Sequence, residues 1–167
     1  GKLPDELYKL PLFVVDKAGI SIDEIAATTK NYVQKFGIKA VFIDYLQLIT
    51  QPKKTNSRND EVGSITRRLK QLCKEVNLPI ICLSQLSRDK HRTRYVLEDL
   101  RDSGEIEQDA DNVMFIYNPY MHNQVTYTLK GNDETFVEGE CVVTLAKCRM
   151  GKLTEFKLNF DGRESRF

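Results

Sequence analysis

The apolar residues of this 167-residue chain fall into short runs separated by segments with helical spacing. Two runs, 40–48 and 80–84, are rich in β-branched residues and are bounded by turn residues or acids. Such runs are typical of strands that are buried on both faces of a parallel sheet. Runs 12–16 and 113–117 predict one strand before these two and another after them.

Two segments between the runs predict amphipathic helices. The first begins at a capping box formed by Ser21 and Glu24, keeps apolar residues at helical spacing as far as Phe36, and stops at Gly37. The second follows the polar segment 51–56 and ends near Asn77. Strands that alternate with helices in this order predict a right-handed βαβ arrangement with a parallel sheet.

The pattern changes after residue 118. Segments 125–129, 140–147 and 153–160 predict strands joined by short turns, which is typical of antiparallel pairing. We therefore expect residues 1–167 to form one α/β domain, with a mostly parallel sheet flanked by helices and antiparallel strands at its C-terminal edge. Residues 118–139 are expected to be a mobile excursion from this domain.

Composition narrows the functional class only slightly. Hydrophobic residues make up 41% of the chain and charged residues 29%, which is ordinary for a soluble globular protein. The net charge of +1 excludes a uniformly basic nucleic-acid-binding protein but leaves local basic clusters possible. The four cysteines have no C-x-x-C spacing, which favours reduced thiols over disulfides or a zinc site. With no apolar run of membrane-spanning length, the sequence predicts a cytoplasmic protein without membrane contact.

Two polar residues follow the predicted parallel strands. Asp44 lies at the carboxyl end of its run, where a carboxylate can hold Mg²⁺ beside a nucleotide phosphate or can simply cap a turn. Gln85 follows the next run and would lie near Asp44 if the two strands are neighbours. Its amide could orient a water molecule or sense the γ-phosphate, or it could bond only to the backbone of its loop.

Further charged residues lie downstream. Segment 98–111 mixes Arg101 and Gly104, which suit a phosphate chain, with carboxylates that suit an ordinary solvated loop. Alternation along a strand sends Lys147 and Arg149 to the same face, about 7 Å apart. Two such cations could meet a triphosphate or could protect an edge strand from aggregation. The sequence contains no G-x-x-x-x-G-K-[ST] phosphate loop.

Four of these segments, 43–48, 83–88, 99–111 and 147–149, together resemble the DnaB family of hexameric replicative DNA helicases, whose motor domain is RecA-like. The resemblance implies that Asp44 is the Walker-B acid on the Mg²⁺ of ATP and that Gln85 couples the γ-phosphate state to the DNA loops. It also implies that Lys147 and Arg149 act in trans on the nucleotide of the neighbouring subunit. The implied contacts to single-stranded DNA come from two loops: Arg101, Asp102 and Gly104 in one, and Lys53, Lys54 and Arg58 in the other.

By this resemblance, the whole protein is an ATP-dependent helicase that moves along single-stranded DNA as a homohexamer and works with a primase and a helicase loader. Since the phosphate loop and the amino-terminal collar domain are absent, this chain alone is not expected to hydrolyse ATP. Asp102, Met150 and the length of segment 121–138 depart from the usual family pattern. Two alternatives stay open, namely a recombinase-type RecA-like ATPase and a degenerate module that binds partners without catalysis.

Overall fold

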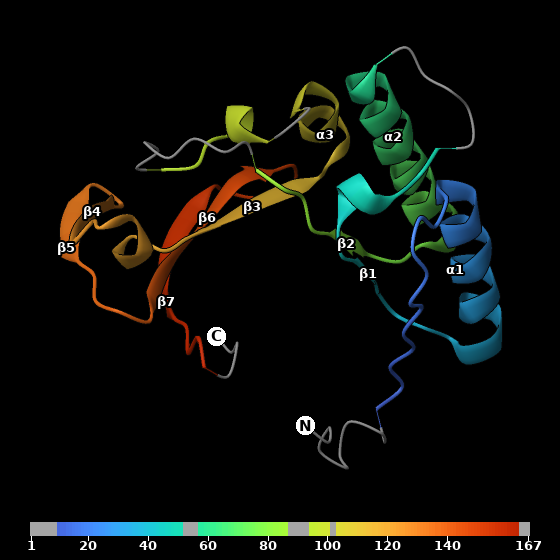
Figure 1. Ribbon diagram of the computed structural model, residues 1–167, viewed down its shortest axis with the longest axis horizontal. Coiled ribbons are helices and arrows are strands. Elements are labelled where there is room, and N and C mark those ends of the chain that lie inside the picture. The colour runs from blue at the N-terminus through green and yellow to red at the C-terminus, as the bar shows by residue number, and fades with distance from the viewer. Residues whose placement is uncertain (1–9, 52–56, 87–93, 101–102, 164–167) are drawn as a thin grey trace. The chain divides into compact units, whose positions relative to one another are not determined.

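The computed structural model describes residues 10–51, 57–86, 94–100 and 103–163 (Figure 1). These residues form two compact units that divide after Gln85. In the described part of the chain, no helix has both the length and the apolar character needed to cross a membrane.

The first unit contains the parallel strands. Its elements are α1 (Ile22–Phe36), β1 (Val41–Ile43), the 3₁₀ helix η2 (Leu46–Leu48), α2 (Arg58–Val76) and β2 (Ile80–Cys82). Strands β1 and β2 pair in parallel, with Phe42 opposite Ile81. A parallel pair requires a long crossover connection, and here α2 provides it.

Local signals set the bounds of both helices. The Ser21 hydroxyl accepts a hydrogen bond from the Glu24 amide at 3.2 Å, and the Glu24 carboxylate accepts one from the Ser21 amide at 3.0 Å, so the predicted capping box is confirmed. Helix α1 ends at Gly37 and α2 at Asn77, and both of these residues have left-handed backbone angles. The two helices pack side by side (Figure 1). Each helix buries apolar residues, namely Ile22, Ile25 and Ala26 in α1 and Val62, Ile65, Leu69 and Leu72 in α2.

Two predictions about this unit are wrong. Residues 12–16 do not form a strand, and Phe13 instead stacks on Phe36 of α1 with a ring-centroid distance of 4.4 Å. The run 40–48 is also not buried on both faces, because Phe42 is 76% exposed. In the described residues, the parallel sheet has only two strands, so nothing covers its Phe42 face. An apolar run indicates that a segment tends to be buried. It forms a strand only if a neighbouring backbone is available for pairing, and the sequence does not show whether one is.

The second unit is built on antiparallel strands. Its elements are η3 (Leu97–Asp99), α3 (Ser103–Asp109), β3 (Asn112–Tyr117), η4 (Tyr120–His122), β4 (Thr126–Leu129), β5 (Asn132–Thr135), β6 (Glu140–Cys148) and β7 (Thr154–Asn159). Strand β6 lies between β3 and β7, and β4 pairs with β5. The three predicted antiparallel strands are therefore confirmed. The run 113–117 is a strand too, but it pairs antiparallel with β6 and not in the parallel sheet.

The segment expected to be a mobile excursion is a folded hairpin. Strand β5, which the sequence did not predict, pairs with β4 through the register Thr126 to Thr135. Phe136 follows β5, is fully buried, and lies in a cluster with Tyr117 and Tyr127. This small core explains why a polar strand such as β5 forms, since the aromatic residues around it supply the buried surface.

The polar stretch 85–111 has the composition of a loop, yet it contains helix α3. Glu105, Gln108 and their neighbours have good helix propensity, which outweighs the turn tendency of Ser and Gly at its start. Ahead of α3, the buried Asp99 accepts a hydrogen bond from the Val96 amide at 2.8 Å and so closes η3.

Candidate functional site

Asp44 and Gln85 follow adjacent strands of the parallel pair. The Leu83 amide donates to the Ile43 carbonyl oxygen at 2.9 Å, so the two strands remain paired up to the residue before Asp44. Asp44 and Gln85 are both exposed. Within the described residues, neither the Asp44 carboxylate nor the Gln85 side-chain amide has a hydrogen-bond partner. The neighbouring-strand condition set by the sequence is thus met, and both side chains are available to a ligand.

The structure adds Gln47, which the sequence did not single out. Its Nε2 donates to the Ser84 hydroxyl at 3.1 Å, and its Oε1 accepts from the Gln85 amide at 3.2 Å. Gln47 is a lone polar residue in the apolar run from Tyr45 to Ile49, and that isolation is the signal that could have identified it.

The residues at this edge fit a magnesium ion that is bound mainly through a nucleotide. Among the described residues, no group of three His, Cys, Asp or Glu side chains could hold a metal ion. Mg²⁺ in nucleotide sites needs only one or two carboxylates, because phosphate oxygens and water complete its six ligands. The free carboxylate of Asp44, at the carboxyl end of a parallel strand, has the chemistry and location for this role.

Lys147 and Arg149 converge on the C-terminal end of α3. The Lys147 ammonium donates to the Glu107 carbonyl oxygen and lies 3.5 Å from the Gln108 carbonyl oxygen. The Arg149 guanidinium donates to the same Gln108 oxygen at 3.4 Å. Both cations therefore reach the same helix end, Lys147 from β6 and Arg149 from the turn directly after that strand. Cations are stabilised at this end of a helix because its last carbonyl groups lack partners within the helix.

The two cations differ in availability. Arg149 also pairs with Asp111 at 3.0 Å, yet its side chain stays 49% exposed. Lys147 is more enclosed by the carbonyl groups of α3. Of the two, Arg149 is therefore the cation that can reach a ligand outside this unit with less rearrangement.

The predicted DNA-binding residues are only partly described. Lys53, Lys54, Arg101 and Asp102 lie outside the described residues. Arg58 begins α2, where it pairs with Glu61 at 2.6 Å and donates to the Gln47 carbonyl oxygen at 2.8 Å. Gly104 lies in the first turn of α3, and a Cβ atom at this position would meet no other atom within 4 Å.

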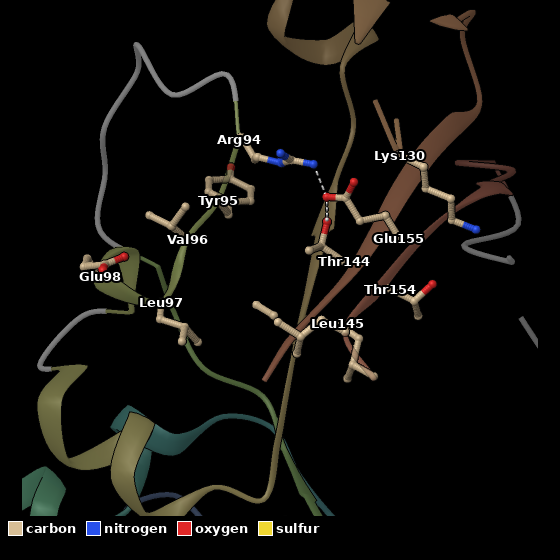
Figure 2. A pocket seen from close by; sticks show the side chains of 12 residues that line it. Arg94, Tyr95, Val96, Leu97, Glu98, Lys130, Thr144, Leu145, Thr154 and Glu155 are labelled. Atoms are coloured by element: carbon tan, nitrogen blue, oxygen red, sulfur yellow. Dashed lines mark hydrogen bonds and ion pairs between the residues drawn. The ribbon is translucent and has the colours of Figure 1, made fainter. Parts of the chain in front are cut away.

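A pocket of about 510 Å³ in the second unit brings together residues that the sequence did not connect. Arg94 points toward Glu155, which also accepts a hydrogen bond from Thr144 at 3.2 Å (Figure 2). Arg94 donates to the Tyr127 hydroxyl at 3.1 Å as well. Burial disfavours the charged form of Arg94 and lowers its pKa. The charge interactions and hydrogen bonds with Tyr127 and Glu155 have the larger combined effect, so the pKa of Arg94 is raised. These contacts hold the segment 94–97 against β7 and the β4–β5 hairpin. This structural role accounts for the cluster of polar side chains without a ligand in the pocket.

In parallel α/β sheets, ligands bind beyond the carboxyl ends of the strands, which is where Asp44 and Gln85 lie. Comparison with protein families makes the assignment specific. Residues 2–167 match the model of the DnaB-like helicase C terminal domain. The chain therefore belongs to this family, and the resemblance seen in the four motifs is confirmed.

Individual relatives agree with this assignment. The chain is 40% identical over 160 residues to the replicative DNA helicase DnaB of Leifsonia xyli subsp. xyli, and 35% identical over 160 residues to that of Haemophilus influenzae. These alignments cover 94% and 93% of the chain but 33% and 32% of the relatives, so the chain spans about a third of their length.

Solved structures give the same result. A DnaB-like replicative helicase, whose interactions with primase were described with its structure, superposes with a TM-score of 0.81 at 34% identity, covering 94% of this chain and 36% of that one. A second solved structure, that of an ATPase domain, superposes with a TM-score of 0.74 at 36% identity, covering 87% of this chain and 50% of that one.

Proposed function

We propose that this chain is part of the RecA-like motor of a replicative DNA helicase, which couples ATP hydrolysis to movement along single-stranded DNA and to duplex unwinding. The observation that carries the proposal is the exposed Asp44 carboxylate at the same edge of the parallel pair as Gln85, in a chain that matches the DnaB-like helicase C terminal domain over residues 2–167. We propose that β1 and β2 belong to a mostly parallel sheet, and that residues 1–167 are one part of a single motor domain.

In this proposal each described residue has a separate task. Asp44 holds Mg²⁺, which neutralises charge on the phosphates of ATP when it is bound. Gln85 carries the state of the γ-phosphate to the DNA loops. Lys147 and Arg149 reach the nucleotide of a neighbouring subunit in a homohexamer, where an arginine supplied in trans stabilises the charge of the transition state.

The DNA contacts in this proposal are to the backbone of one strand. Arg101, Asp102 and Gly104 would form one contact loop, and Lys53, Lys54 and Arg58 the other. Because contacts to phosphate carry no sequence information, the resulting movement is independent of sequence. A primase and a helicase loader are the proposed partners, the first in line with the DnaB-like helicase whose interactions with primase are known.

The proposal is tested on the full-length protein with a labelled DNA fork. We expect ATP-dependent strand separation and ATP turnover that is stimulated by single-stranded DNA. Asp44→Asn should abolish both activities, because the amide is a poor ligand for Mg²⁺. Asp16→Asn is the matched control, since Asp16 is also an exposed acid after an apolar run but lies far from β1 in sequence. Strand exchange without unwinding would instead indicate a recombinase, and absence of any ATP turnover would indicate a partner-binding module.

A further inference from the structure

Gln47 occupies a central position between the proposed catalytic edge and α2. It lies on η2, three residues after Asp44, and its side chain is partly buried. A glutamine has both a donor and an acceptor at its end, so it can bridge two groups at once. In this structure it does so, and both groups lie in the segment directly after β2.

The two bonds of the Gln47 side chain hold consecutive residues. Its Nε2 donates to the Ser84 hydroxyl at 3.1 Å, while its Oε1 accepts from the Gln85 backbone amide at 3.2 Å. Strand β2 ends at Cys82, so the regular ladder between the strands does not hold Ser84 and Gln85. The side chain of Gln47 therefore takes over where the strand pairing stops.

The backbone of Gln47 is held from the opposite direction. Arg58, the first residue of α2, donates to the Gln47 carbonyl oxygen at 2.8 Å. Its guanidinium also pairs with Glu61, at 2.6 Å, in the first turn of the same helix. A continuous set of hydrogen bonds thus runs from the start of α2 through Gln47 to Gln85.

We propose that Gln47 is a positioning residue that transmits displacements of the α2 N-terminus to Gln85. This inference rests on the proposed function, because it assigns a regulator to the proposed γ-phosphate sensor. When Arg58 moves, it pulls on the backbone of Gln47, and the side-chain bridge passes the movement to the Gln85 backbone. The proposed role explains why a polar side chain is placed within an apolar run.

A role in positioning differs from a role in stability in a measurable way. Gln85 is exposed, so water can replace the missing bond when Gln47 is changed. We therefore expect Gln47→Leu to fold with nearly unchanged thermal stability but to leave the direction of Gln85 undefined. The affected quantity is the coupling between DNA and ATP turnover, which such residues alter by roughly 2- to 30-fold.

The test measures ATP turnover of the full-length protein with and without a single-stranded oligothymidylate. Gln47→Leu should lower the ratio of DNA-stimulated to unstimulated kcat by about 2- to 30-fold, with KM for ATP unchanged. Ser84→Ala, which removes one of the two side-chain bonds, should lower the ratio by less. Gln51→Leu is the matched control, because it removes a glutamine–serine hydrogen bond of 2.6 Å to Ser64, and among the described residues neither side chain bonds to Gln85.

Each result has a distinct meaning. A normal ratio in Gln47→Leu, or an equal fall in Gln51→Leu, overturns the positioning role of Gln47. If Gln47→Leu does not fold, Ser84→Ala decides alone, and a normal ratio in that variant overturns the proposal. A wild-type protein whose turnover does not respond to DNA contradicts the proposed function itself, so the two failures are distinguishable.

Discussion

Replacing Arg149 by alanine separates the proposed catalytic role of this residue from its structural role, because the two roles predict effects of very different size. A trans arginine accelerates phosphoryl transfer by about 10³–10⁵, which corresponds to about 4–7 kcal/mol of transition-state stabilisation. Within the chain, the substitution removes an ion pair with Asp111 at 3.0 Å, in which both side chains are more than 40% exposed, and a long hydrogen bond of 3.4 Å to the Gln108 carbonyl oxygen. Such surface pairs contribute about 0–1 kcal/mol to stability. We therefore expect a large loss of turnover with almost no loss of folding stability.

The assay is phosphate release by the full-length protein with Mg²⁺, ATP and single-stranded DNA, together with urea unfolding and binding of a fluorescent ATP analogue. Arg149→Ala should lose turnover but retain nucleotide binding. Asp111→Asn removes the same ion pair without touching the arginine, so it should leave turnover near wild type while also costing little stability. Turnover of Arg149→Ala within about tenfold of wild type would refute the reasoning, as would an equal loss in Asp111→Asn.

If Arg149 acts on the nucleotide of a neighbouring subunit, mixing two different inactive variants should restore some activity. Arg149→Ala subunits keep Asp44, and Asp44→Asn subunits keep Arg149. When the two inactive proteins are mixed, some interfaces regain both residues, and ATP turnover should partly return. Mixtures that stay inactive, although the subunits exchange, would show that both residues act within one subunit.

Three further predictions concern the folded chain. Phe136→Ala should lower the free energy of unfolding by about 3–5 kcal/mol in urea titrations, because Phe136 is fully buried, whereas Val137→Ala at its exposed neighbour should cost less than about 0.5 kcal/mol. The hydrogen bond from Lys17, together with the capping box, lowers the pKa of Glu24 from 4.5 to about 2. Its stabilising contribution is thus complete above pH 4.5 and disappears as the pH falls towards 2, so Glu24→Gln should destabilise the protein at pH 7 but not at pH 2. Burial raises the pKa of Cys82 to about 12, which leaves roughly one thiolate in ten thousand at pH 8; mass mapping should find Cys82 resistant to iodoacetamide when folded and labelled in urea.

The sequence predicted the relative position of Asp44 and Gln85 correctly, because that position depends on the order of strands along the chain. Asp44 and Gln85 each follow an apolar run, and parallel pairing of β1 with β2 places them at the same edge of the sheet. Lys147 and Arg149 do converge as expected, but on a helix end rather than on one strand face, because Arg149 lies in the turn after β6. The partners of these cations could not be predicted, because they are carbonyl groups at the end of a helix whose polar composition favours a loop.

What the sequence determined by itself is local. The ends of α1 and α2 depend on a capping box and on residues that tolerate left-handed backbone angles, and these act within a few residues of one another. Membership in the DnaB-like family could also be predicted from the sequence, because it depends on short motifs and on their order along the chain. Only the tertiary structure decided that run 12–16 stays unpaired, that Phe42 is exposed, that β5 forms beside Phe136, and that Gln47 bridges to Gln85. Each of these depends on a backbone, ring or polar group brought from elsewhere in the chain, and neither hydrophobic periodicity nor propensity carries that information.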